Sequence, residues 1–217
     1  MPGPGSRSFI AFVLAGGLLA GCTSTGMRSI TFVTPEVSEA YIPLYMGTRL
    51  GSSRFAAAVV VAPNVAVTND HNLNLLSEEM VIARSPAYDL LFFRTERTHV
   101  PPIASPKVGQ TVIAYGQDGQ RRRKEATGVV RELNARAIAL CADCPERPTI
   151  TYDADAGVGF SGGPVVDVAS GAVVGITVGY LDGAAEDGGR RMYAMDMDFV
   201  MAEMRRLLPG EMAAPGR

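Results

Sequence analysis

The sequence predicts an all-β protein made of short antiparallel strands. Its 24 glycines and 14 prolines are spread along the chain and separate many short apolar runs. Runs of that length between turn residues are typical of strands, and their close spacing favours β-barrels over alternating layers of helix and sheet. With 217 residues, 47% of them hydrophobic, the chain can form one large domain or two small packed ones.

A first series of strands is expected before Pro101. Phe55–Val61 and Val65–Thr68 are β-prone runs split by Ala62-Pro63-Asn64, which predicts a hairpin. Further strands are expected at Ile30–Val33, Met80–Ala83 and Leu90–Phe93.

A second series of six short runs follows the connecting stretch that begins at Pro101-Pro102. Each run is bounded by turn residues, as expected for a second barrel. The six runs are Thr111–Tyr115, Thr127–Val130, Ala137–Leu140, Thr149–Tyr152, Val165–Val168 and Val173–Val178.

The end of the chain predicts a helix instead. Asp196 is placed to cap a helix that runs to Leu208. Its apolar residues fall at helical spacing and would form one face. These residues are Phe199, Val200, Met204, Leu207 and Leu208.

The charge balance argues against nucleic acid as a partner. Lys and Arg total 20, Asp and Glu total 22, and the formal net charge is −2. Binding to a phosphate backbone needs a clustered positive surface, which this composition does not favour. We also expect no cofactor and no metal, and the sequence leaves the oligomeric state open.

The N-terminus predicts an exported and lipid-anchored protein. Arg7 precedes an apolar stretch, Phe9–Ala20, which is too short for a comfortable membrane span and is typical of a secretory signal. Its last two residues and the two that follow are Leu19-Ala20-Gly21-Cys22, a segment that resembles the bacterial lipobox. That resemblance implies a signal peptide over residues 1–21, a diacylglycerol on Cys22 and a tether over residues 22–28. An ordinary secretory signal with a chance cysteine is the alternative.

The residue after the lipidated cysteine bears on the choice of membrane. Thr23 stands where an Asp often retains lipoproteins at an inner membrane. We therefore expect an outer membrane location facing the periplasm. Acyl chains hold a protein on a bilayer without a spanning helix.

Cys141 and Cys144 form the motif Cys-Ala-Asp-Cys. An exported location favours a local disulfide between them. A thioredoxin-like redox pair is the alternative, but it needs a helix at the first cysteine, and Pro145 and Pro148 disfavour one. A metal site is disfavoured because no histidine or second cysteine pair stands nearby.

Three segments carry the candidate chemistry. They are Val67–His71 (VTNDH), Pro86–Leu91 (PAYDLL) and Gly159–Pro164 (GFSGGP). Each resembles a motif of the trypsin-like, chymotrypsin-fold serine peptidases, closest to the HtrA/Deg-type protease domains. The order His, Asp, Ser along the chain is also that of the family. The resemblance covers roughly residues 50–208, and we expect no PDZ domain after it.

The resemblance implies two packed six-stranded antiparallel β-barrels followed by a C-terminal helix. The peptidase domain would span residues 29–210, with a first barrel at about 29–100, a second at about 107–195 and the helix at about 196–208. Residues 211–217 would form a disordered tail. Only 18 positions separate His71 from Asp89, which suggests that the first barrel has lost a hairpin.

The resemblance also implies a serine endopeptidase that hydrolyses peptide bonds in protein or peptide substrates. A Ser hydroxyl is a poor nucleophile at neutral pH and needs an adjacent base. His71 would take the proton of Ser161 and later give it to the leaving amine, while Asp89 would orient the imidazole. The backbone amides of Gly159 and Ser161 would form the oxyanion hole.

Other assignments of these residues are possible. Asp70 adjoins His71 but would point the other way along an extended chain, so Asp89 is preferred. The second histidine, His99, is expected in a loop. The segment from Gly159 also fits the G-x-S-x-G elbow of α/β-hydrolases, but that family needs a histidine after the serine and none follows.

Two other functions remain open from the sequence. One is a latent or inactive binding module that keeps the peptidase fold. The other is thiol redox chemistry at Cys141 and Cys144.

Substrate specificity is predicted from the position of Asp155, six residues before Ser161. In trypsin-like enzymes an Asp at that offset lies at the floor of the specificity pocket and selects Arg or Lys by charge pairing. Thr177 and Tyr180 are candidate pocket walls. The alternative is that Asp155 only bonds nearby amides or faces solvent.

Overall fold

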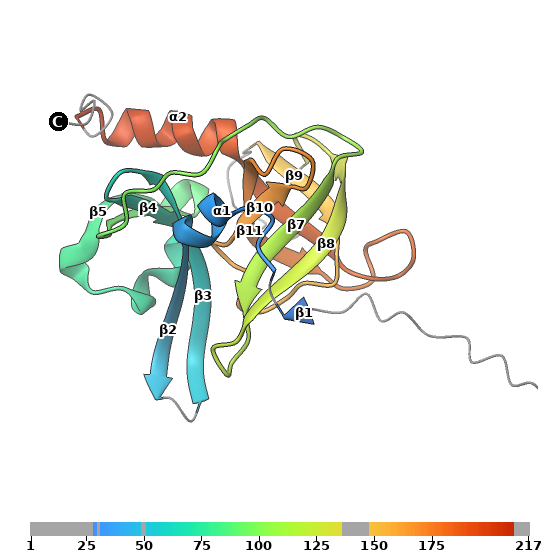
Figure 1. The fold of residues 1–217 in the computed structure, drawn as a ribbon, viewed down its shortest axis with the longest axis horizontal. Helices are drawn as coiled ribbons and strands as arrows, with labels where there is room; N and C mark the ends of the chain where they lie inside the picture. Colours follow the sequence, from blue (N-terminus) through green and yellow to red (C-terminus); the bar gives the residue numbers. More distant parts are fainter. Residues whose placement is uncertain (1–27, 30, 49–50, 136–147, 211–217) are drawn as a thin grey trace, which may run out of the picture.

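The computed structural model describes residues 28–29, 31–48, 51–135 and 148–210 of the chain. Two β-sheets lie side by side and one long helix runs along them (Figure 1). Cys22, Cys141, Cys144, the predicted strand Ala137–Leu140 and the predicted tail lie outside the described residues. No helix within the described ranges is long and apolar enough to cross a bilayer.

The second half of the chain forms a closed barrel. Six strands follow one another around it in the order β8-β7-β10-β11-β12-β9, and β9 pairs back with β8. This confirms the expected second barrel, but β12 was not among the six predicted runs, and the predicted run Ala137–Leu140 lies outside the described residues. The strands are β7 (Thr111–Gln117), β8 (Arg123–Glu132), β9 (Thr149–Asp153), β10 (Pro164–Asp167), β11 (Val173–Leu181) and β12 (Arg191–Asp196).

Alternating side chains fill this barrel. Val112, Ile150, Val165 and Met192 are fully buried in one apolar cluster. Burial of that kind is the main favourable term in folding. Closure between β8 and β9 depends on Gly128, because a Cβ at that position would lie 2.4 Å from the Asp153 carbonyl oxygen.

The first half of the chain forms a five-stranded antiparallel sheet in the order β2-β3-β4-β6-β5. No pairing joins β2 to β5 among the described ladders, so the expected six-stranded first barrel is not what this half shows. The strands are β2 (Tyr41–Thr48), β3 (Gly51–Ala62), β4 (Val65–Thr68), β5 (Val81–Ser85) and β6 (Leu90–Arg94).

The N-terminal segment differs from the prediction. The expected strand Ile30–Val33 is absent over its described residues, and β1 (Arg28–Ser29) instead pairs with β8 of the other sheet. A short helix, α1 (Pro35–Ala40), then begins at Thr34, whose Oγ1 accepts a hydrogen bond from the Val37 amide at 3.3 Å. Ser/Thr caps followed by proline are typical of a helix start.

Strand β2 was also missed from the sequence. It contains Pro43, which lacks an amide donor and normally argues against a strand. Here the proline is tolerated because β2 is the outer strand and pairs only with β3.

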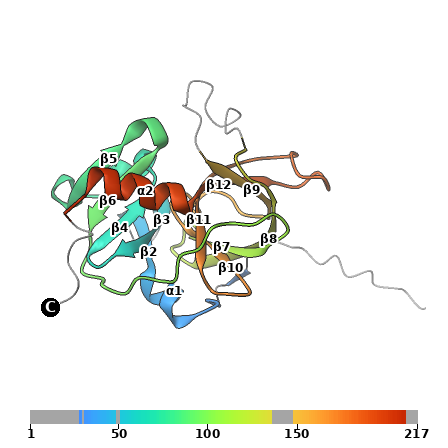
Figure 2. The same cartoon turned by 90° about the horizontal axis from the view of Figure 1, so that it is seen from above.

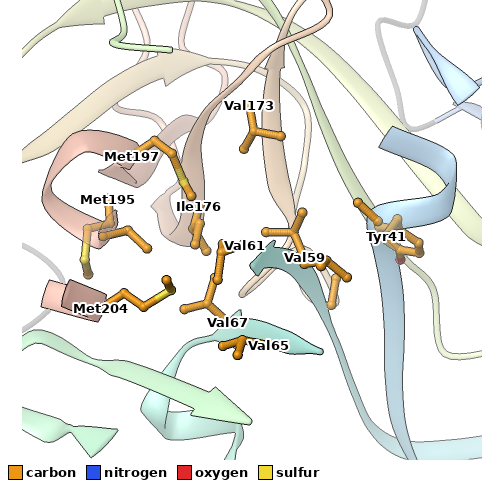
Figure 3. Close-up of a cluster of buried hydrophobic side chains, with 14 of the residues drawn as sticks. Tyr41, Val59, Val61, Val65, Val67, Val173, Ile176, Met195, Met197 and Met204 are labelled. Carbon is orange, nitrogen blue, oxygen red and sulfur yellow. The ribbon is translucent and has the colours of Figure 1, made fainter. Parts of the chain in front are cut away.

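A shared apolar core joins the two sheets to the C-terminal helix. Val59 and Val67 from the first sheet contact the same cluster as Ile176 and Met195 from the second (Figure 3). The helix α2 (Met197–Leu207) adds Met204 to this cluster. The three elements therefore bury a common set of side chains.

Helix α2 confirms the predicted C-terminal helix. The Asp196 side chain caps it by accepting from the Asp198 amide at 2.7 Å. The helix starts beside the second sheet and extends over the first (Figure 2). There the Ser85 hydroxyl at the end of β5 donates to the buried Glu203 carboxylate at 2.5 Å.

Candidate active site

A cleft of about 460 Å³ holds residues from both sheets. Phe55 belongs to the first sheet, and His71 lies in the turn that follows β4. Gly159 and Ser161 come from the loop before β10, and Tyr180 from β11. The remaining lining residues are Arg54, Asn72, Asn74, Leu75, Gly157, Val158 and Gly179.

His71 is held by Asp89. It lies in a 3₁₀ helix, Asp70–Leu75, directly after β4. Its Nδ1 is 2.9 Å from Asp89 Oδ2 and 3.1 Å from Oδ1, and its backbone amide donates to Oδ1 at 3.0 Å. The carboxylate therefore fixes both the ring and the backbone of His71, while 47% of the His71 side chain stays exposed to solvent.

A strained turn positions Asp89. Pro86–Tyr88 form a short 3₁₀ turn, and Asp89 closes it with φ 55°, in the left-handed region. Asp tolerates that region better than most residues, because its short polar side chain can bond locally. The Asn69 side chain also donates from Nδ2 to the Asp89 backbone carbonyl at 3.3 Å. The turn thus presents the carboxylate to His71 and leads into β6.

Asp70 points away from the imidazole. Arg84 of β5 donates to its two oxygens from Nε at 2.7 Å and from Nη2 at 2.8 Å. This two-bond pair fastens the turn that carries His71 to β5. The other histidine, His99, lies in a loop with its Nδ1 3.4 Å from Glu39.

Ser161 lies where the two sheets meet. Its carbonyl accepts from the Ala57 amide of β3 at 2.9 Å and from the Asn72 side chain at 3.4 Å. Its hydroxyl donates to the Val178 carbonyl at 3.3 Å. Ser161 and His71 line the same cleft, but no hydrogen bond joins them among the described residues.

The loop before Ser161 needs glycine. Gly159 has φ +93°, and a Cβ there would lie 2.0 Å from the Gln117 carbonyl oxygen and 2.6 Å from the Phe55 ring. The backbone amides of Gly159 and Ser161 donate to no protein acceptor within the described ranges. Two free amides beside a hydroxyl are the donors that an oxyanion requires.

The comparisons with known proteins identify the family. The family model of the trypsin-like peptidase domain matches residues 56–176, more than half of the 217 residues. The chain belongs to the trypsin-like peptidase family. It is therefore a serine endopeptidase, a hydrolase of protein or peptide substrates. No curated protein matches the chain in sequence.

Solved structures of proteases share the fold. The active form of the Rv3671c protease from M. tuberculosis aligns with a TM-score of 0.63 at 18% identity, over 100% of this chain and 97% of that one. The HtrA-type protease AlgW with a tripeptide gives 0.62 at 18%, over 81% and 64%. The serine endoprotease from Yersinia pestis gives 0.62 at 18%, over 84% and 69%. At these identities the matches establish the fold.

Two residues of the peptidase site were not predicted from the sequence. Asn72 binds the Ser161 carbonyl and also donates to Thr68 Oγ1 at 3.0 Å. Gln117 is fully buried, and its Nε2 donates to the Leu44 and Ala56 carbonyls at 2.5 Å each. Asn72 directly follows His71 in the sequence, and this position could have marked it as a residue of the site. Nothing in the local sequence marks Gln117, because its partners are distant along the chain.

Gln117 also supports the loop of Gly159. Its backbone amide donates to the Gly159 carbonyl at 3.2 Å. One residue at the end of β7 therefore joins β2, β3 and the loop before Ser161. Its Oε1 is buried and has no hydrogen-bond partner in the part of the chain that the structure describes.

Asp155 lies in a neighbouring hollow of the peptidase. It is 50% exposed and pairs with Arg190, with Oδ1 3.5 Å from Nη1. Arg190 also donates to Asp182 at 2.7 Å, which raises the pKa of the guanidinium. The guanidinium lies 4.7 Å from the centre of the Tyr180 ring. Arg190 thus lies between Asp155 and one wall of the cleft that holds Ser161.

The two other predicted pocket residues differ in position. Tyr180 lines the cleft. Thr177 is buried, and its hydroxyl is 2.9 Å from the Tyr152 hydroxyl. Burial raises the pKa of Tyr152, so this pair stays neutral and supports β11 from inside the barrel.

Acidic and histidine side chains do not gather into a metal site within the described ranges. No group of three or more His, Cys, Asp or Glu residues there is placed to hold a metal ion.

We expect Gly159→Ala to destabilise the protein more than Gly183→Ala. Both glycines have positive φ, at +93° and +70°, so both variants carry the strain of a left-handed alanine. Only Gly159 is crowded, whereas a Cβ at Gly183 meets nothing within 4 Å. Overpacking adds about 2 kcal/mol to the loss at Gly159. Urea unfolding of both variants measures this, and equal losses would contradict the contact with Gln117.

Proposed function

We propose that His71, Asp89 and Ser161 act as a catalytic triad that hydrolyses peptide bonds through an acyl-enzyme. The observation that carries this proposal is the 2.9 Å contact between His71 Nδ1 and Asp89 in a cleft that also holds Ser161. Because Nδ1 contacts Asp89, Nε2 is the ring nitrogen of His71 that remains available as the base for Ser161.

The Asp89 contact sets the tautomer. An ionised carboxylate only accepts hydrogen bonds, so Nδ1 carries the proton and Nε2 keeps its lone pair. Nε2 then takes the proton of Ser161 as its Oγ attacks the substrate carbonyl carbon. Asp89 stabilises the imidazolium that forms.

Ser161 must first rotate toward His71. At 3.3 Å its hydrogen bond to Val178 is long for a hydroxyl donor, whose usual range ends near 3.0 Å. A long bond is weak, and side chains move between staggered positions about χ1. We infer that rotation about χ1 exchanges the Val178 carbonyl for the imidazole as the partner of the Ser161 hydroxyl.

The later steps use the same groups. The Gly159 and Ser161 amides would hold the oxyanion, and loss of one such donor costs about 3 kcal/mol in related chemistry. The imidazolium then protonates the leaving amine and the C–N bond breaks, which leaves an ester on Ser161. Water, deprotonated by His71, hydrolyses this ester and restores the serine.

A latent or inactive binding module with the same fold is the second candidate. The observation in its favour is the Ser161 hydroxyl, which bonds to Val178 and not to His71. The two candidates differ in whether Ser161 reacts with an electrophile.

We expect a fluorophosphonate probe to label the wild type and not Ser161→Ala. In the wild type, His71 activates the hydroxyl, and the free amides hold the phosphoryl oxygen. Labelling is read by mass spectrometry on the intact protein. Failure of a folded wild type to react would favour the latent module.

Peptide hydrolysis separates the roles of the two carboxylates near His71. Asp89→Asn should lower kcat by about 10⁴, because it favours the wrong imidazole tautomer. Asp70→Asn is the matched control, and it removes only the charge that pairs with Arg84. Similar losses in both variants would contradict the assignment of Asp89.

We further propose that the peptidase is anchored to a bacterial membrane through a lipid on Cys22, at the outer membrane facing the periplasm. The lipobox-like segment ending at Cys22 supports this proposal. The seven residues from Cys22 to Arg28 span at most about 25 Å. A tether of that length would restrict the enzyme to substrates close to the membrane surface.

The lipid anchor predicts a change in fractionation. Cys22→Ala should give an exported protein that is recovered in the soluble fraction, because it lacks the acyl chains that partition into the bilayer. Ser161→Ala, which leaves Cys22 intact, is the control and should remain with membranes. Membrane retention of Cys22→Ala would count against the anchor.

We keep Asp155 as a proposed specificity residue, in competition with Arg190. A cationic substrate side chain would have to replace Arg190 at the Asp155 carboxylate. For the wild-type enzyme, an Arg before the scissile bond of the substrate should therefore raise kcat/KM only slightly.

We expect Arg190→Gln to raise the kcat/KM ratio of Arg to Leu substrates about twofold to fivefold, the range of an exposed ion pair. Asp155→Asn in the same background should cancel the gain. Asp182→Asn is the control, since it removes the other partner of Arg190 and leaves Asp155 paired. An unchanged ratio in Arg190→Gln would remove the role of Asp155.

A further inference from the structure

Arg54 is a cation exposed in the active-site cleft. It lies on β3, and it is the only Lys, Arg, Asp or Glu among the residues that line this cleft. Its guanidinium forms no hydrogen bond or ion pair within the described part of the chain. By contrast, Arg190 behind the cleft already contacts Asp182 and Asp155.

The position of His71 identifies which part of a substrate Arg54 would meet. The leaving amine must lie next to the imidazole that protonates it. The 3₁₀ helix that carries His71 also contributes Asn74 and Leu75 to the cleft. Arg54 and Phe55 line the cleft from β3 of the first sheet, and the 3₁₀ helix follows β4 of that sheet. Residues after the scissile bond therefore run along the first-sheet wall.

The opposite wall belongs to the second sheet. Gly179 and Tyr180 of β11 line it together with Gly157. This wall is left to residues before the scissile bond, on the acyl side. The only fixed charge of the cleft lining lies on the other side.

The backbone around Arg54 is well held. Arg54 pairs with Met46 in the β2–β3 ladder. Two residues further along β3, the carbonyl of Ala56 accepts a hydrogen bond from the Gln117 side chain at 2.5 Å. The neighbouring Phe55 ring packs against the backbone at Gly159. The strand therefore fixes where the Arg54 side chain begins, while the exposed side chain still loses rotamer freedom when it binds a carboxylate.

We propose that Arg54 selects substrates with Asp or Glu in the first residues after the scissile bond. This inference rests on the proposed function, because it takes the leaving-group side from the role of His71. An exposed pair of guanidinium and carboxylate contributes modestly, and salt screens it. The expected preference is therefore a few-fold and depends on ionic strength.

The test uses quenched peptides that differ only in the second residue after the scissile bond, as Glu, Gln or Lys. The wild type should cleave the Glu peptide about twofold to fivefold better than the Gln peptide, with Lys last. Arg54→Gln should remove the order, and Arg54→Glu should reverse it. Arg205→Gln, an exposed change on helix α2, is the control that should keep the wild-type order.

Binding provides a readout that does not need turnover. Fluorescence anisotropy of peptides with the same sequences, labelled with the fluorophore alone, should give the same order on Ser161→Ala, and the difference should shrink in high salt. Equal affinity for Glu and Gln peptides, or no reversal in Arg54→Glu, would overturn the inference.

The two proposals fail in different ways. A wild type that reacts with the fluorophosphonate but shows no charge order retains its catalytic assignment and loses the role of Arg54. A wild type that does not react, but whose Ser161→Ala variant still prefers Glu, retains the charge selection and loses the catalytic assignment.

Discussion

The hydrogen bond from the Ala57 amide to the Ser161 carbonyl joins the two sheets at the candidate active site. Ser161 belongs to the loop before β10 of the barrel, whereas His71 and Asp89 lie in connections between strands of the five-stranded sheet. Their mutual placement therefore depends on how the sheets meet. Asn72 adds a second contact to the same carbonyl at 3.4 Å. Displacing one sheet would break this junction, because Ala57 lies on β3, Asn72 lies in the 3₁₀ helix after β4, and their acceptor lies in the loop before β10 of the barrel.

The loop that carries Ser161 is held by crowding as much as by hydrogen bonds. A Cβ at Gly162 would lie 2.1 Å from Thr68 Oγ1, and one at Gly163 would lie 2.0 Å from the Tyr115 carbonyl oxygen. The absence of side chains lets backbone from both sheets approach closely. Because this crowding restrains the loop backbone, the proposed mechanism assigns the change of hydrogen-bond partner to rotation of the Ser161 side chain. In the proposed mechanism, that rotation replaces the hydrogen bond to the Val178 carbonyl with one to His71.

The sequence predicted the barrel, helix α2 and the motifs around His71, Asp89 and Ser161 because local patterns encode them. Alternating apolar runs predict strands, and Asp196 predicts a helix start. It did not predict β2, whose Pro43 is tolerated only at a sheet edge. The number of strands in the first sheet depends on long-range pairing. The environments of Gln117 and Asp155 depend on residues distant in the chain, so local patterns carried no signal for them.

Charge placement gives the two sides of the cleft different roles. On the acyl side, Arg190 is already bound by Asp182 and Asp155, so each of these three charges is largely balanced before a substrate arrives. On the leaving-group side, Arg54 is exposed at the cleft without such partners in the described ranges. A balanced charge responds weakly to a new ion, because binding must first break an existing pair. Under the roles proposed for His71 and Arg54, electrostatic selection would therefore fall on the residues after the scissile bond, because Tyr180 and the glycines of the opposite wall carry no charge.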